Sequence, residues 1–318
     1  MHKKDIKRFS FSRFRTFHTC PLQHYYQYVE QVDTPESPNT IPGKLFHEAI
    51  EAYLNDMDLT PIYKEFIKHV NNGTLDMDQD QLQYTVEKYL AYYEKDYEAE
   101  NTLLVEGDLT EDLEDDDYMT VVIDQVYERD GHTIMRDIKT SLNKLKYMAD
   151  DMQYNQQLLL YLPYAEEHLG VKIDAIEIDE VKFGKLEEVP INNNGKPTAD
   201  RRRLSNVTYE DYYNELASRG LEDEDSYQDI LQYLQTRGHP LFNRVRSQVL
   251  DRNIIDSNLN DMHSTYKLIK NNNEELPMHR VRGPLCNYCA FKDLCSLDMH
   301  NPTDTERDTV KVKIKIGK

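Results

Sequence analysis

The sequence predicts an α/β protein whose centre is a β-β-β-α-β unit, because two periodicities alternate along the chain. Segments rich in β-branched residues, with alternating apolar and polar positions, fill the middle of the chain over residues 102–190. Helical patterns flank this unit on both sides, and the cysteines lie towards the two ends. With 318 residues and 39% hydrophobic content, the chain is long enough to bury a sizeable core as one elaborated domain.

The N-terminal third is expected to be mainly helical. Aromatic residues recur at helical spacing over 10–30, where Pro21 interrupts the pattern. A proline-containing linker over 34–39 separates this segment from a helix over 43–53. Apolar residues at helical spacing then predict a helical insertion over 56–101.

The middle of the chain is predicted to hold the strands. Residues 102–106 form one strand, and residues 118–128 and 133–138 form a hairpin around a short turn. A helix over 152–169, ended by a glycine, and an alternating strand over 173–183 complete the unit.

The last third is predicted to be helical again over 208–275, after a polar loop over 192–203. The basic tail is expected to end the chain as a short strand. In chain order, the predicted parts of the single domain are 1–55, 56–101, 102–190, 191–280, 281–300 and 301–318.

The charge distribution and the hydropathy limit which binding partners and which cellular compartment are expected. The formal charge of −20 argues against a general nucleic-acid footprint, but net charge governs solubility and association rate and leaves a local basic groove open. Basic patches remain over 139–146, 201–203, 280–282 and 311–318. No apolar run approaches the roughly 20 residues that span a bilayer, and the N-terminus is polar. We therefore expect no membrane association and a reducing cytoplasmic location, either bacterial or, for a phage protein, that of the host cell.

Two carboxylates and a lysine stand out on the predicted hairpin. Asp124 lies on its first strand, and Asp137 and Lys139 lie two residues apart on the second, so that both leave the same face. The intervening Ile138 points into the core and offers its carbonyl to a metal. Mg²⁺ or Mn²⁺ prefers such oxygen ligands, and a lysine can orient or deprotonate an attacking water. The pattern favours metal-dependent phosphodiester chemistry; the alternative is an edge strand with ordinary surface charges.

At these residues the chain resembles the RecB-like branch of the PD-(D/E)XK nuclease superfamily. The resemblance implies a restriction-endonuclease-like core, a mixed central sheet flanked by helices, with helical insertions and a C-terminal cysteine staple. The segments that carry it are Gly43-Lys-Leu-Phe-His47, Asp124, Asp137-Ile-Lys139-Thr140 and Gln157-Leu-Leu-Leu-Tyr161.

The same resemblance implies roles for individual residues. Lys139 would be the catalytic lysine, and Gln157 and Tyr161 would position the substrate or that lysine. Glu106 is a weaker candidate, at a place where the family often has a strand acid. The implied catalytic residues are Asp124, Asp137, Lys139, Gln157 and Tyr161. The implied ligands of one or two Mg²⁺ or Mn²⁺ ions are His47, Asp124, Asp137 and the carbonyl oxygen of Ile138.

The four cysteines indicate a second metal centre. Cys286, Cys289 and Cys295 lie close together, and Cys20 lies far away in sequence. Four thiolates suit zinc or an iron–sulfur cluster, but zinc ribbons usually use two Cys-x-x-Cys pairs and this chain has one. The segment over 10–28 resembles the N-terminus of AddB-type and CRISPR-associated iron–sulfur nucleases. That resemblance implies a structural [4Fe–4S] cluster on Cys20, Cys286, Cys289 and Cys295.

Together these patterns predict a metal-dependent DNA nuclease, an exonuclease acting on DNA ends or on single strands. A helicase or recombination protein is a compatible partner, because the sequence holds no phosphate-binding loop of a helicase motor. Two other interpretations stay open: a non-catalytic DNA-binding or recombination accessory module, and a zinc-stapled acidic protein that binds other proteins and mimics DNA.

Overall fold

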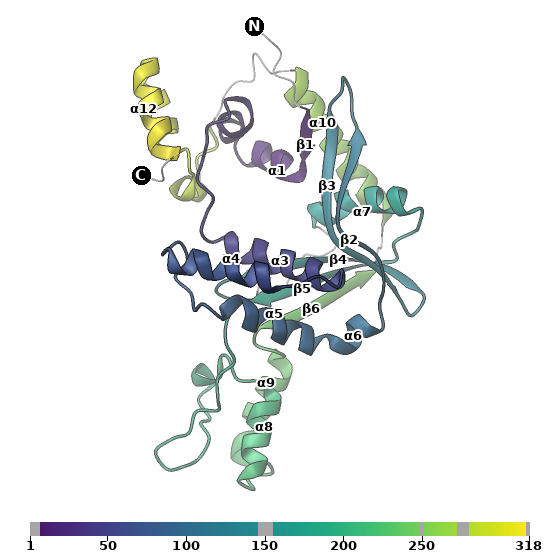
Figure 1. Cartoon of the computed structure of the whole chain (residues 1–318), viewed down its shortest axis with the longest axis vertical. Coiled ribbons are helices and arrows are strands. Elements are labelled where there is room, and N and C mark those ends of the chain that lie inside the picture. The colour runs from purple at the N-terminus through teal and green to yellow at the C-terminus, as the bar shows by residue number, and fades with distance from the viewer. Residues whose placement is uncertain (1–6, 146–154, 249–250, 272–279, 316–318) are drawn as a thin grey trace.

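A mixed sheet of six strands lies at the centre of the molecule (Figure 1). The computed structural model describes residues 7–145, 155–248, 251–271 and 280–315. The strand order is β1-β3-β4-β5-β6, and β2 pairs with the other edge of β3. The strands are β1 (Arg8–Ser10), β2 (Asn101–Asp112), β3 (Tyr118–Arg129), β4 (His132–Ser141), β5 (Ala175–Lys182) and β6 (Phe242–Gln248).

Helices cover both faces of this sheet. The α-helices are α1 (Phe11–Thr19), α2 (Pro21–His24), α3 (Ile41–Leu54), α4 (Thr60–Asn71), α5 (Gln81–Tyr92), α6 (Glu94–Glu98), α7 (Gln156–Leu169), α8 (Tyr209–Ser218), α9 (Asp225–Arg237), α10 (Arg252–Asn271), α11 (Lys292–Leu297) and α12 (Asp304–Lys315). A π-helical turn, η1 (Tyr25–Val29), follows α2, and the 3₁₀ turns are η3 (Arg201–Leu204), η4 (Pro284–Tyr288) and η5 (Asp298–His300). Among the segments described, no helix has the length and apolar character needed to cross a bilayer.

Two hydrophobic cores hold the sheet between its helical layers. On one face, Ile123 and Ile178 pack with Leu162 of α7 and Met262 of α10. On the other face, Ile138 packs with residues of α3 and α5. Because both faces are covered, the central strands bury side chains on both sides. The charged ones among them, such as Glu177 and Asp179 of β5, are paired with arginines. The predicted fold class, a mixed sheet flanked by helices, is confirmed.

The pairing of β3 with β4 ends halfway along both strands, which opens a fork in the sheet. β4 pairs with β3 only over 132–136, opposite the C-terminal half of β3. The first residues of β3, 118–120, pair instead with β1. β4 continues beside β5 as far as Ser141. Figure 1 shows β2 and β3 rising away from the plane of β4, β5 and β6. We call the region where β3 and β4 separate the fork.

Two expectations about the last third of the chain are wrong. Residues 208–275 were expected to be helical, yet they contain β6. The inward positions of β6 carry Arg244 and Arg246, which meet the buried carboxylates of Asp179 and Glu177 on β5, so its charge pattern conceals a strand.

The basic tail also differs from expectation. Over the part that the structure describes it forms the helix α12, not a strand. Lys311 and Lys315, one helical turn apart, make ion pairs with Glu30 and Asp33, and only Ile314 of the helix is buried. The alternation of lysine with Val and Ile therefore does not mark a strand over 304–315, where the described chain is helical.

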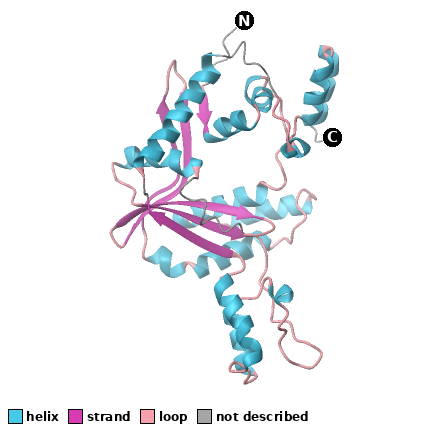
Figure 2. Cartoon of the chain, turned by 180° about the vertical axis from the view of Figure 1, so that it is seen from behind, coloured by secondary structure: helices cyan, strands magenta, loops and turns pink. Residues whose placement is uncertain are grey.

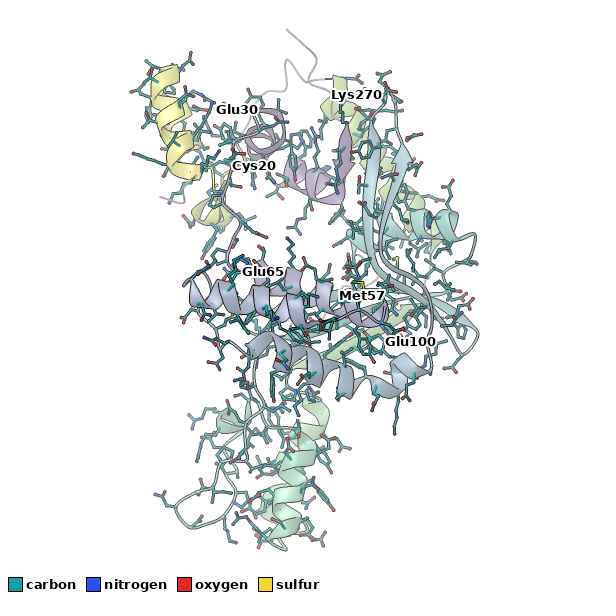
Figure 3. The ribbon with its side chains drawn as sticks, viewed as in Figure 1. Cys20, Glu30, Met57, Glu65, Glu100 and Lys270 are labelled. Carbon is teal, nitrogen blue, oxygen red and sulfur yellow. The ribbon has the colours of Figure 1, made fainter. Side chains whose placement is uncertain are left out.

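The chain between β5 and β6 forms a helical lobe, residues 183–241. Figures 1 and 2 show α8 and α9 projecting from the rest of the molecule, away from β2 and β3. A small core of its own, including Leu216 and Leu234, holds the lobe together. At the opposite end, Figure 3 shows Cys20 and Glu30 beside the C-terminal segment, in line with the ion pair between Arg307 and Glu30.

Candidate active site

Asp124 fills the fork. One of its oxygens, Oδ2, accepts a hydrogen bond of 2.6 Å from the backbone N–H of Ile138. This bond takes the place of a strand-to-strand bond where β3 and β4 separate, so the carboxylate is fixed by the backbone of the next strand. The other oxygen, Oδ1, remains directed towards the groups described below.

Asp137 and Lys139 form the second part of the site. The Lys139 Nζ donates to Asp137 Oδ1 at 2.9 Å and to Oε1 of Gln157 at 3.0 Å. Gln157, at the start of α7, is also hydrogen-bonded to the hydroxyl of Tyr161 one turn later. Ile138, between the two charged residues, is 3% exposed and points to the other face. One continuous chain of contacts thus runs from Tyr161 through Gln157 and Lys139 to Asp137.

His47 and Glu106 complete the cluster from two other elements. Nδ1 of His47, on α3, lies 3.4 Å from Oε1 of Glu106 and 3.5 Å from Oδ1 of Asp124. Glu106 stands opposite Asp124 across the β2–β3 pair, and its φ of +43° is in the left-handed region. Glu106 was expected only as a weaker candidate. In the structure it lies beside His47 and Asp124.

Gly43 explains how α3 brings His47 so close to the sheet. A Cβ added to Gly43 would lie 2.5 Å from Oγ1 of Thr140 on β4, a distance that no side chain tolerates. Gly43 and His47 are four residues apart and share one face of α3. The missing side chain at Gly43 therefore permits the close approach that places the imidazole over the fork.

The predicted site residues surround one cavity of about 480 Å³. A neighbouring cavity of about 480 Å³ shares Lys139, Thr140 and Gln157 with it and is lined on its outer side by Arg15 and Lys144. The predicted residues that line the first cavity are His47, Asp124, Asp137, Ile138, Lys139, Gln157 and Tyr161. The structure brings them together, and their catalytic roles stay predictions.

Burial and neighbouring charges set the protonation of the acidic cluster. Burial alone would lower the pKa of His47, but the carboxylates of Asp124 and Glu106 outweigh it and raise the pKa to about 10. Burial raises the pKa of Asp137 to about 6, although the Lys139 ammonium opposes the rise. Burial likewise raises the pKa of Glu106. Three acidic groups share a small volume, and a divalent cation there would offset their desolvation and mutual repulsion.

The donor atoms fit a hard divalent cation. Ligand atoms of His47, Glu106 and Asp124 all lie within 4.8 Å of one another. Both carboxylate oxygens of Asp137 contact the Lys139 ammonium, with Nζ 2.9 Å from Oδ1 and 2.8 Å from Oδ2. Carboxylate oxygens and an imidazole nitrogen suit Mn²⁺ and are compatible with Mg²⁺.

Among the further residues that line the same cavity, four polar ones near β1 were missed by sequence reasoning. Arg8 and Ser10 come from β1, Ser12 from α1 and Thr120 from β3. A strand of three residues is too short to give a periodic signal, and β1 was expected to be part of the N-terminal helical segment. Only the pairing of β1 with β3 reveals that these residues face the fork.

The four cysteines line a separate cavity of about 280 Å³ between α2, η4 and α11. Leu22, Tyr26, Phe291 and Leu294 form a small core beneath the thiols and hold both ends of the chain together. Burial raises the pKa of the Cys289 thiol, and the other three cysteines add to the rise, which reflects their proximity.

Comparison with known proteins adds one family. A sequence model of the PD-(D/E)XK nuclease superfamily matches residues 8–296. The match begins at β1 and ends within α11, so it includes the sheet, the fork and the cysteine-lined cavity. No curated protein matches the sequence.

Proposed function

Because the chain belongs to the PD-(D/E)XK nuclease superfamily, we propose that it is a metal-dependent DNA nuclease whose active site is the fork. The observation that carries this proposal is the convergence of Asp124, Asp137 and Lys139 on one cavity, with Lys139 Nζ 2.9 Å from Asp137 Oδ1. Two carboxylates and an ammonium group from separating strands are the groups that phosphodiester hydrolysis requires.

The ligands proposed for the metal are His47, Asp124 and Asp137, with Glu106 beside them. When bound, a divalent cation supplies Lewis acidity at the phosphate and lowers the pKa of a water molecule. Asp124, held by the Ile138 amide, keeps its free oxygen oriented towards the cation without rearrangement.

Lys139 is proposed to act on the attacking water and on the charge that develops on the phosphate. Its ammonium is held between the carboxylate of Asp137 and the amide oxygen of Gln157, so Nζ stays at the mouth shared by the two cavities. From there it can orient the water and stabilise negative charge on a non-bridging oxygen. Tyr161 fixes the amide of Gln157 and so acts through it on the lysine.

We propose that the enzyme degrades DNA from its ends or along single strands. The cavity is walled by β1 and α1 on one side and by α3 on another, and α7 provides a further wall. A strand end or a flexible single strand can bend between these walls more easily than the middle of a stiff duplex does. Covalently closed circular DNA tests this mode, because an exonuclease leaves it intact.

The catalytic proposal is tested with end-labelled single- and double-stranded DNA in the presence of Mg²⁺ or Mn²⁺. We expect Lys139→Ala and Asp137→Ala to lower the hydrolysis rate at least about 100-fold. Arg202→Ala, an exposed site in the helical lobe, is the control and should retain activity. Circular dichroism and thermal melting establish that each variant folds. Full activity in a folded Lys139→Ala protein would refute the assignment, and wild-type protein that binds DNA without cutting it would favour an accessory module.

We also propose that the cysteine-lined cavity holds a structural [4Fe–4S] cluster. All four thiols line one cavity of about 280 Å³. Four cysteine thiolates are the usual ligands of such a cluster, and the single Cys-x-x-Cys pair of this chain departs from the two pairs usual in zinc ribbons.

Chemical analysis of anaerobically purified protein tests the cluster. We expect about four iron and four acid-labile sulfide per chain for the proposed cluster type, with their loss in Cys286→Ser and Cys289→Ser. Because the thiols hold both ends of the chain together, these variants should also be cleaved faster by proteases in the segment after residue 280. Colourless protein with stoichiometric zinc would overturn the assignment.

A further inference from the structure

One wall of the active-site cavity, beside the proposed metal ligands, is built of hydrogen-bond donors. Arg8 and Ser10 alternate along β1 and leave the same face, and Ser10 pairs with Thr120 on β3. Ser12 stands in the first turn of α1, and all four residues line the cavity that holds Asp124. We call Arg8, Ser10, Ser12 and Thr120 the donor wall.

Thr120 carries the strongest sign that this wall receives a ligand. The residue is 3% exposed, and its hydroxyl makes no hydrogen bond to any described residue. Every second residue along this part of β3 lies on one face, and the side chains of Thr120, Val122 and Asp124 on that face line the cavity. A buried hydroxyl without a partner is unfavourable, so the site is suited to an acceptor that enters from the cavity.

The start of α1 adds further donors. Ser10 caps this nine-residue helix by accepting from the N–H of Arg13, and the first turn contains no acidic residue. The positive end of the helix therefore faces the cavity without an internal counter-charge. In the described part of the chain no carboxylate lies within ion-pairing distance of Arg8, although the protein carries 58 acidic residues.

The polarity of the cavity separates two kinds of ligand. The half formed by His47, Asp124 and Asp137 offers acceptors and suits a cation, whereas the donor wall offers a guanidinium, hydroxyls and helix amides. This second set is complementary to phosphate oxygens. Because both halves line one cavity, a nucleic-acid strand whose scissile phosphate lies at the metal would bring a neighbouring phosphate to the wall.

The geometry points to a second phosphate-binding subsite, formed by the donor wall, that holds a non-scissile phosphate of the DNA strand. The inference rests on the proposed function, because it names the part of the DNA that the same cavity contacts. The phosphate is either the terminal one at a strand end or an internal phosphodiester, since both present the same non-bridging oxygens.

Binding measured without hydrolysis tests the subsite independently of nuclease activity. Fluorescence anisotropy in EDTA follows single-stranded oligonucleotides that carry one neutral methylphosphonate at successive positions, and a further pair with and without a 5′-phosphate. For the wild-type protein we expect one substitution to weaken binding at least about tenfold, because it removes a charged acceptor. If affinity falls only when the 5′-phosphate is removed, the subsite holds the terminal phosphate. If affinity falls when one internal position is neutralised, the subsite holds that phosphodiester.

Variants assign the effect to the wall. Arg8→Ala and Thr120→Val should weaken binding of the unmodified strand. In these variants a neutral methylphosphonate at the sensitive position should cause no further loss of affinity. Thr120→Val replaces an unpartnered buried hydroxyl by a methyl group of similar volume and so should not destabilise the fold. Arg202→Ala, in the helical lobe, is the matched control.

The outcome separates this inference from the proposed function. If no single phosphate matters, or if Arg8→Ala and Thr120→Val bind like Arg202→Ala, the subsite is refuted even when the wild-type protein cuts DNA. If the phosphate scan shows the sensitive position but Mg²⁺ and Mn²⁺ support no cleavage, the subsite stands and the nuclease assignment fails.

Discussion

At the scale of single residues, Gly43 sets the position of His47, a proposed metal ligand. Because a Cβ at this position would lie 2.5 Å from Oγ1 of Thr140, Gly43→Ala must displace the Thr140 side chain or push α3, and His47 with it, away from β4. We expect a loss of about 1–3 kcal/mol in the free energy of unfolding and a weaker affinity for Mn²⁺. Urea denaturation and isothermal titration calorimetry measure the two effects.

A second-site change separates this steric cause from the effect of alanine in a helix. Thr140→Ala removes the clashing oxygen, so the double variant Gly43→Ala/Thr140→Ala should regain stability and metal affinity relative to Gly43→Ala. Lys44→Ala, exposed on the same helix, is the control and should change neither. If the double variant is no better than the single one, close approach of α3 to β4 is not the reason for the glycine.

The residues also show what the sequence could predict of the site. Asp137 and Lys139 could be grouped in advance, because strand periodicity brings them to one face, whereas only the family resemblance placed Gln157 with them. Glu106 was only a weaker candidate from the sequence, although it lies beside His47 and Asp124. The residues of the donor wall were not predicted. Their place depends on how β2 and β1 pair with β3, and pairing between distant segments leaves no local signal.

At the scale of elements, a buried ionic network fixes β4, β5 and β6 to one another. Arg136 of β4 is fully buried, and its guanidinium donates to Glu177 Oε1 at 2.7 Å and to Gln125 Oε1 at 2.6 Å. Glu100, which Figure 3 labels near the lower part of β2 and β3, pairs with the same guanidinium. The neighbour of Arg136 in sequence is Asp137, so this network also holds in register the strand that carries this proposed metal ligand.

We therefore expect Arg136→Met to destabilise the protein by about 3–5 kcal/mol, because it leaves buried carboxylates without a counter-charge. The control Arg202→Met removes an exposed arginine and should change the free energy of unfolding by less than about 0.5 kcal/mol. Chemical denaturation of both variants makes the comparison. A similar small loss in both would mean that the network contributes little beyond an apolar replacement.

This network also explains which elements were recognised from sequence. The hairpin of β3 and β4 and the strand β5 were predicted, because their apolar positions alternate against a hydrophobic core. β6 was not, because its inward residues are arginines paired with carboxylates of β5. The strand is stabilised by ion pairs that exist only once the sheet has formed, and its composition alone resembles a charged helix.

At the scale of the whole molecule, the protein must bind a polyanion while carrying a net charge of −20. Basic residues gather locally: Arg8 lines the active-site cavity, and Arg15, Lys139 and Lys144 line the adjoining one. Elsewhere many cations are neutralised, as Lys311 and Arg307 are by Glu30. Attraction is thus confined to contact range, whereas repulsion between the acidic surface and DNA acts at longer range.

These two ranges predict an unusual salt dependence of DNA association. The screening length falls from about 30 Å at 0.01 M salt to about 10 Å at 0.1 M, so added salt first removes the long-range repulsion. We expect the association rate constant, measured by stopped-flow fluorescence in EDTA, to rise over this interval and to fall only at higher salt, when contacts in the cavities are screened. Arg15→Ala/Lys144→Ala should lower the rate at every salt concentration while the initial rise persists. A rate that falls steadily from the lowest salt, as for a protein with a broad basic surface, would show that the net charge does not control the encounter.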